Sequence, residues 1–329
     1  MQPNRVIISQ DELLNHFGSS QKLEICDLMQ MQKLLEMNIP SEVWEDASNR
    51  NLLSFSQEFV QGTQEFTLVF NYNRKIENFH LNFISNLSNL TELNLSENQI
   101  SDISSICKLK NLKKLVLAKN CIEDISSLQS LTDLTQLDLF ENKLTSYTLA
   151  LPNLVELQLG YNKLQEKYGI QHSPKLEILN LSYTETVDLN TISQLFSLKV
   201  LKLRVNNISN IAQISNFVDL RILSLGYNQL LQNIVPLKFC TQLAELSISG
   251  TSVVDIWPLQ FMKNLKTFDM ANTKVIDLHP LQNLYKLEDF SAHRARIIDI
   301  SLLIRFLILQ LQQNHKQRYS KAPQEFFKI

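Results

Sequence analysis

The stretch "LTELNLSENQISDISSICKLKNL", from Leu90 to Leu112, spaces its leucines and isoleucines in a way that fits neither a helix nor a plain strand alternation. The same pattern recurs along the chain. Its copies begin at Leu112, Leu134, Leu154, Leu176, Leu198, Leu220, Leu243, Leu265 and Leu287. Successive first residues are 22, 22, 20, 22, 22, 22, 23, 22 and 22 residues apart. A fixed period in this range predicts a solenoid of stacked repeats.

Each repeat divides into a strand, a turn and a return segment. Leu93 and Leu95 have the period of two that places both side chains on one face of a short strand. Successive repeats stack these strands in parallel, so the leucines form a continuous core that no single repeat could build. The residues between the leucines face the other way and are available to a partner.

An asparagine follows the strand in most repeats. Its amide both donates and accepts, so a buried column of asparagines is expected to satisfy the backbone groups of the turn. These residues are Asn98, Asn120, Asn142, Asn162, Asn206 and Asn228. Thr184, Thr251 and Thr273 take the same place, where a hydroxyl can replace part of the hydrogen bonding. At Ala295 the column is expected to end.

The return segment is too short for a long helix, so 3₁₀ turns or extended backbone are expected there. An aspartate recurs at its start and is interpreted as a cap for backbone N–H groups. The positions are Asp102, Asp124, Asp188, Asp255, Asp277 and Asp299. A row of acidic residues could also suggest a metal site, but one aspartate per repeat favours the structural role. Pro236, Pro258 and Pro280 follow where a missing N–H is tolerated.

The pattern LxxLxLxxNxIxDIxxLxxL resembles the leucine-rich repeats of the SDS22-like subfamily, typified by a yeast phosphatase regulator. "DIWPL" at Asp255 and "DLHPL" at Asp277 also resemble the DIxPL repeats of bacterial internalins. The resemblance covers Leu90 to about Ile300. It implies an α/β solenoid of horseshoe form, with a parallel β-sheet on the concave face and a 3₁₀ or extended convex face. For function it implies binding of a partner protein.

The boundaries of the array are predicted from where the pattern fades. Residues 1–60 form an N-terminal flanking region, with a helix expected from Leu23 to Met37 before Pro40. Residues 61–299 form the array of about ten clear repeats and a degenerate first one around Leu68. Residues 300–329 form a C-terminal cap and tail. Both flanks are expected to cover open ends of the sheet, although the N-terminal region could instead be a separate binding module.

Composition narrows the class of protein and its location. A net charge of -2 argues against a general nucleic-acid binder. The longest apolar stretch, residues 300–311, is interrupted by Arg305 and is too short to span a bilayer. The start of the sequence shows no secretory signal, and the four cysteines have no metal-ligand spacing. We therefore expect a cytoplasmic protein, with the nucleus or cilium as alternatives, that acts as a monomer without contacting membrane or nucleic acid.

Motifs for catalysis are not found in the sequence. The six glycines and six histidines are scattered, and no phosphate loop, nucleophile elbow or zinc helix is present. The chain is therefore predicted not to be an enzyme and to need no cofactor or metal. An enzyme whose groups converge from several repeats stays a remote alternative.

The candidate site is a group of aromatic and charged residues in the middle of the concave face. Aromatics and arginine supply much of the binding energy at protein interfaces, and a repeat surface does not need aromatics there for folding. The predicted partner-binding residues are Phe140, Glu141, Glu156, Tyr161, Tyr183, Arg204 and Tyr227. The tyrosines could instead simply cover neighbouring side chains.

Two functional hypotheses follow for a non-catalytic module of this kind. The resemblance to phosphatase regulators implies that the array docks a phosphatase catalytic subunit and alters its turnover. Alternatively the array is a cytoskeletal or ciliary scaffold that leaves catalysis unchanged.

Overall fold

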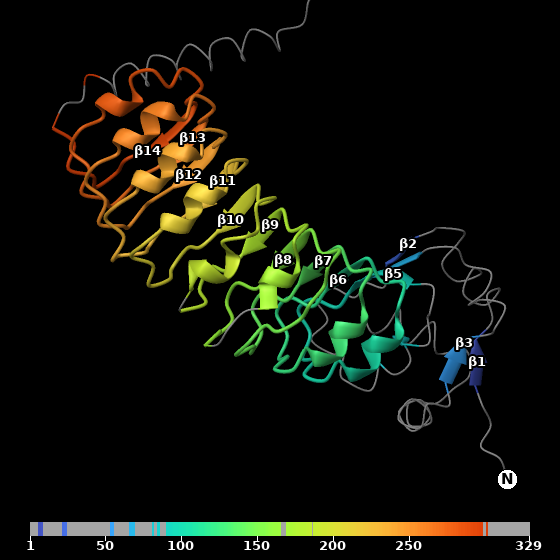
Figure 1. The fold of residues 1–329 in the computed structure, drawn as a ribbon. Coiled ribbons are helices and arrows are strands. Elements are labelled where there is room, and N and C mark those ends of the chain that lie inside the picture. Colours follow the sequence, from blue (N-terminus) through green and yellow to red (C-terminus); the bar gives the residue numbers. More distant parts are fainter. Residues whose placement is uncertain are drawn as a thin grey trace, which may run out of the picture. The chain divides into compact units, whose positions relative to one another are not determined.

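The computed structural model describes residues 90–165, 169–185 and 187–298, four short strands nearer the N-terminus, and residues 81, 84, 85 and 301. The chain divides into two compact units, Met1–Leu198 and Lys199–Ile329. Each unit carries part of the repeat array (Figure 1). The predicted boundaries at residues 60 and 300 stay a prediction.

Short parallel strands line up in repeat order within each unit (Figure 1). In the first unit they are β1 (Val6–Ile8), β2 (Lys22–Glu24), β3 (Leu53–Phe55), β4 (Phe66–Val69), β5 (Leu90–Asn94), β6 (Lys114–Val116), β7 (Gln136–Asp138), β8 (Glu156–Gln158) and β9 (Ile178–Asn180). In the second they are β10 (Val200–Lys202), β11 (Ile222–Ser224), β12 (Glu245–Ser247), β13 (Thr267–Asp269) and β14 (Asp289–Ser291). β1 pairs with β3 in a small separate sheet.

The return segments contain 3₁₀ helices, as the repeat length predicts. These are η1 (Ser104–Lys108), η2 (Ser126–Ser130), η3 (Gly169–His172), η4 (Leu189–Ile192), η5 (Ala212–Asn216), η6 (Val235–Phe239), η7 (Trp257–Phe261) and η8 (His279–Leu281). Parallel strands on one side and 3₁₀ turns on the other confirm the predicted leucine-rich repeat solenoid.

The core lies between these two layers. Corresponding leucines face one another in register, with Leu93 opposite Leu115 and Leu115 opposite Leu137. All three are 1% exposed or less. Burying one leucine side chain contributes about 1.5–3 kcal/mol, so the stacked column is the main stabilising feature of the array. In the second unit Phe268 and Phe290 continue the column, with ring centroids 5.9 Å apart.

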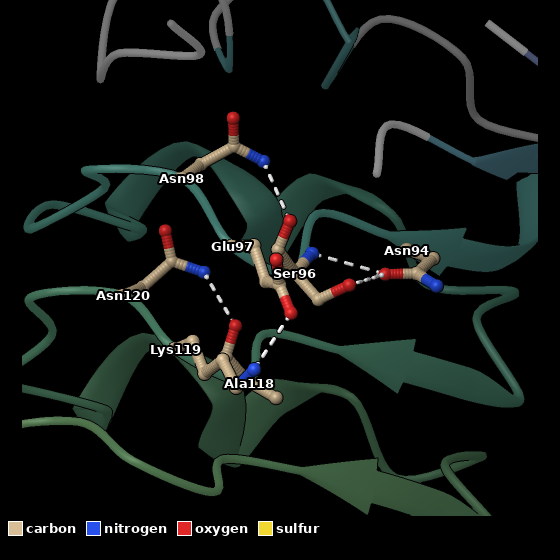
Figure 2. A network of polar contacts seen from close by, with 7 residues as sticks. All are labelled: Asn94, Ser96, Glu97, Asn98, Ala118, Lys119 and Asn120. Carbon is tan, nitrogen blue, oxygen red and sulfur yellow. Dashed lines mark hydrogen bonds and ion pairs between the residues drawn. The ribbon is translucent and has the colours of Figure 1, made fainter. Parts of the chain in front are cut away.

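The asparagine column bonds successive turns to one another, as predicted. Asn120 Nδ2 donates to the carbonyl oxygen of Leu95 at 2.9 Å and to that of Leu117 at 3.0 Å. Its Oδ1 accepts from the backbone N–H of Ile100 at 3.0 Å. Figure 2 shows Asn98 and Asn120 turned toward the carbonyl groups of their own turns. Thr184 makes one such bond, to Leu181, which confirms that a hydroxyl replaces part of the amide's role.

The recurring aspartates are caps of the return segments. Asp102 Oδ1 accepts from the backbone N–H of Ser104 at 2.8 Å, and Asp277 Oδ1 accepts from that of His279 at 2.8 Å. Asn210 and Asn233 make the same bond in two repeats that lack the aspartate. A neutral amide serves equally well at this position, so the structural interpretation of the acidic row is confirmed for these repeats. Asp299 lies outside the described residues.

The N-terminal prediction needs a correction. Lys22–Glu24 is the strand β2, paired in parallel with β4 at Leu23 opposite Leu68, so the prediction of a helix beginning at Leu23 is wrong for its first residues. The backbone groups along the edge of β4 are satisfied by another strand. β4 in turn pairs with β5, which confirms the strand of the degenerate first repeat at Leu68. The rest of the expected helix and the C-terminal cap, apart from Ser301, lie outside the described residues.

Between each strand and its asparagine, one residue adopts the left-handed conformation. We call this the exit position. Its φ values run from 53° to 68° at Glu97, Lys119, Glu141, Tyr161, Tyr183, Val205, Tyr227, Gly250, Asn272 and Arg294. A positive φ costs a non-glycine residue free energy, most of all a β-branched one. The turn therefore fixes this conformation whatever residue is present.

Val205 is the β-branched exception at the exit position, with φ 53°. We expect Val205→Gly to raise the free energy of unfolding by about 1 kcal/mol, because glycine removes the steric cost of the left-handed conformation. Urea unfolding measures this difference. Asn272→Gly is the matched control and should change stability little, since asparagine already tolerates this conformation. Equal changes in the two variants would show that the β-branch is not the cause.

Candidate partner-binding surface

Three aromatic side chains of the first unit contact one another on the strand face, meaning the side of the sheet opposite the buried leucines. The ring centroids of Phe140 and Tyr161 lie 5.0 Å apart at an angle of 57°. Those of Tyr161 and Tyr183 lie 4.0 Å apart at 19°, a stacked pair. Tyr161 and Tyr183 stack because both occupy exit positions of adjacent repeats, where parallel strands are about 4.8 Å apart. We call Phe140, Tyr161 and Tyr183 the aromatic tier.

Phe140 reaches the tier from a different position, the last residue before its exit position. Its ring lies against Gly160, where an added Cβ would approach the ring Cδ2 and Cε2 atoms to 3.1 Å. The same Cβ would lie 3.0 Å from the carbonyl oxygen of Ser182. Glycine at 160 therefore leaves the room that lets Phe140 join Tyr161. Tyr161 remains 43% exposed, so the tier presents an open aromatic surface.

The second unit holds the other two predicted residues as a pair of their own. The Arg204 guanidinium lies 4.4 Å from the centroid of the Tyr227 ring, a cation–π contact. Tyr227 lies against Gly250, whose added Cβ would meet the ring at 3.0 Å. Tyr227 is 42% exposed and occupies an exit position, so it matches Tyr161 in backbone conformation and exposure.

The predicted acidic residues lie beside the aromatic tier and have different surroundings. Glu141 is exposed, at the exit position that precedes Tyr161 in the array. Glu156 is half-buried on β8, where Gln158 Nε2 donates to its Oε1 at 2.9 Å and Gln136 Nε2 donates to its Oε2 at 3.3 Å. The two amides hold this carboxylate in one orientation.

Asp138 was not among the predicted site residues, although it lies next to them on β7. Its Oδ1 accepts from the backbone N–H of Phe140 at 2.9 Å. Burial raises the pKa of this carboxyl above its usual range, and the neighbouring Glu156 adds to the effect. The N–H of Phe140 and Lys114 act in the opposite direction. Its place on the strand face was predictable, but its burial depends on neighbouring repeats.

Exposed aromatic side chains also occur on the return side of the second unit. Phe239 is 49% exposed at the end of η6, and Phe261 is 43% exposed at the end of η7. Phe261 packs edge-on against Trp257, with centroids 5.9 Å apart. Their spacing of one repeat was visible in the sequence, but only strand-facing positions were considered. These residues form a second apolar surface against which the aromatic tier can be compared.

The described residues offer little for metal or membrane chemistry. Within them, no group of three or more histidine, cysteine, aspartate or glutamate side chains could hold a metal ion. The described helices include none long and apolar enough to cross a membrane. Cys107, Cys121 and Cys240 are free thiols, and burial raises the pKa of Cys240 to about 12.

Comparison with known proteins defines the class. Residues 88–130 and 110–151 match the family model described as Leucine Rich repeats (2 copies). An internalin (inlF) from Listeria monocytogenes is 28% identical with a TM-score of 0.70, over 76% of this chain and 73% of that chain. No curated protein matches the chain.

Two further solved structures share the fold alone. The functional domain of InlJ from Listeria monocytogenes is 21% identical with a TM-score of 0.61, over 74% of this chain and 52% of that chain. A leucine-rich repeat protein from Leptospira interrogans is 20% identical with a TM-score of 0.60, over 94% of this chain and 98% of that chain. The chain is therefore a leucine-rich repeat protein, of a class that generally acts in protein interaction. Its nearer relation to the SDS22-like subfamily stays a prediction.

Proposed function

We propose that the chain is a non-catalytic interaction module that binds a partner protein on its strand face, at the aromatic tier of the first unit. The observation that carries this proposal is the stacking of Tyr161 on Tyr183 at exit positions. The same position is filled by glutamate, lysine, valine and arginine in other repeats, so the fold does not require an aromatic residue there. Stacked, partly exposed tyrosines are typical of binding surfaces.

The finer identity of the partner rests on resemblance. The SDS22-like pattern supports a phosphatase catalytic subunit, and a cytoskeletal or ciliary scaffold is the alternative. A phosphatase assay on the captured complex separates them, because a scaffold should leave turnover unchanged. We further propose that the protein acts as a monomer in the cytoplasm, where free thiols such as Cys107 and Cys121 persist.

Replacing both Tyr161 and Tyr183 with alanine tests the proposal. The double variant should lose about 2 kcal/mol of binding free energy, roughly a thirtyfold weaker affinity, because two interface aromatics are removed. The melting temperature should fall little, since Tyr161 is largely outside the core. The measurement is partner capture by the immobilised full chain, with the captured proteins identified and then titrated.

Two control variants distinguish this surface from the alternatives. Tyr227→Ala removes a tyrosine of matched conformation and exposure from the second unit. Phe261→Ala removes an aromatic of equal exposure from the return side. Normal binding by the double tyrosine variant, with loss in Phe261→Ala, would place the partner on the return side instead. Loss only in Tyr227→Ala would move the site to the second unit.

A further inference from the structure

Carboxylates surround the aromatic tier on the strand face. Asp138 and Glu156 lie on adjacent strands, and Glu141 follows Phe140 directly. The like charges of Asp138 and Glu156 act on one another, since Glu156 helps to raise the pKa of Asp138. Their interaction costs free energy that a bound cation would relieve.

The hydrogen bonds of Glu156 orient its charge without neutralising it. Both donors, Gln136 Nε2 and Gln158 Nε2, belong to neutral amides. The carboxylate is thus held in place beside the tier before any partner arrives. A preorganised charge of this kind binds a cation with little loss of side-chain freedom.

The lysines near the tier balance this charge only in part. Lys114 acts on Asp138 from the neighbouring strand. Lys119 is bound to Glu97 through an ion pair of 2.7 Å. Lys143 and Lys163 follow the ladder asparagines and begin the descending side of their repeats. Negative charge therefore prevails beside Phe140 and Tyr161.

The second unit shows what a tyrosine at the exit position can hold. There the Arg204 guanidinium lies over the Tyr227 ring at 4.4 Å. Tyr161 has the same backbone conformation and nearly the same exposure, but its ring contacts aromatic neighbours and carboxylates lie close to it. A ring face flanked by carboxylates attracts a cationic side chain through both its quadrupole and the neighbouring charge.

We propose that the strand face of the first unit binds an extended partner segment carrying arginine or lysine, whose cationic group lies on the tyrosine rings beside Glu141 and Glu156. This inference rests on the proposed function and names the chemistry of the partner. Arginine should bind better than lysine, because its planar guanidinium stacks on a ring and bonds a carboxylate at once.

The test uses the full chain and short fluorescent peptides of Gly-Ser-Arg, Gly-Ser-Lys, Gly-Ser-Gln and Gly-Ser-Glu repeats, followed by fluorescence anisotropy. The arginine peptide should bind most tightly and the glutamate peptide not at all. The double variant Glu141→Gln with Glu156→Gln should bind the arginine peptide about tenfold more weakly, and added salt should reduce its effect. Tyr161→Ala should weaken binding as well.

Glu245→Gln is the matched control, since Glu245 holds on β12 the position that Glu156 holds on β8. It should leave the affinity unchanged. The inference fails if no peptide binds saturably, if the glutamine peptide binds as tightly as the arginine peptide, or if the Glu245 variant loses as much affinity as the double variant. In each of these cases the proposed function survives, provided that the double tyrosine variant still loses the partner.

Discussion

An Asn162→Ala variant should lose about 3 kcal/mol or more of unfolding free energy, since each buried backbone group left without a partner costs about 1–3 kcal/mol. Asn162 is 1% exposed. Its Nδ2 donates to the carbonyl oxygens of Leu139 and Leu159, both at 2.9 Å, and its Oδ1 accepts from the N–H of Leu144 at 3.0 Å. Alanine can make none of these bonds, and no water reaches a fully buried turn to replace them.

Asn142→Ala is the matched control for this loss. Asn142 makes corresponding bonds, to the carbonyl oxygens of Leu117 at 2.9 Å and Leu139 at 3.1 Å, but its side chain is only half-buried. Water can replace part of its bonding, so the loss should be clearly smaller. Denaturant unfolding followed by circular dichroism measures both. Equal losses would show that the number of bonds, and not burial, decides the cost.

Asn162→Thr extends the comparison to a substitution that the array itself contains. Thr184 retains one bond, from its Oγ1 to the carbonyl oxygen of Leu181 at 2.8 Å. A threonine at 162 should keep the corresponding bond to Leu159 and fall between asparagine and alanine in stability. A variant as unstable as the alanine would mean that the bond to the preceding repeat carries the whole effect.

The repeat period explains how much of the fold was predictable. A separation of 22 residues places the same position of adjacent repeats side by side, so the sequence already implied that Tyr161 and Tyr183 would be neighbours. The same rule predicted the buried leucines and the asparagine column. It works because each residue's surroundings are set by its own repeat and the two next to it.

Features that depend on contacts between unlike positions were not predictable in this way. Phe140 lies one position before Tyr161 in repeat register, and only the space at Gly160 shows that the two rings meet. The raised pKa of Asp138 depends on burial by neighbouring side chains. Nor did the sequence indicate a division after Leu198, since the period of 22 residues continues across it.

A Gly169→Ala variant should also be strongly destabilised, by about 3 kcal/mol, because the added methyl group would overlap backbone atoms. A Cβ at 169 would lie 2.7 Å from the carbonyl carbon and 2.8 Å from the carbonyl oxygen of Thr148. The Gly169 N–H donates to the carbonyl oxygen of Tyr147, which holds the two segments together. Neither side of this contact can move without breaking that bond.

The close approach follows from the one shortened repeat. The repeat that begins at Leu134 has 20 residues, and between residues 143 and 153 its described return segment contains no 3₁₀ helix. Tyr147 is fully buried there and fills space behind the sheet. The next return segment therefore packs directly on the Tyr147–Thr148 backbone, and only glycine leaves room for it.

Gly226→Ala provides the control for the glycine-to-alanine change itself. Its added Cβ would come nearest to the Ser249 Oγ, at 3.0 Å, a side-chain atom that can rotate away, while the nearest backbone atom is 3.3 Å distant. This variant should lose less than about 1 kcal/mol. Melting temperatures of the two variants give the comparison. If both fall equally, the clash with Thr148 is not the cause, and the shortened repeat places no special demand on residue 169.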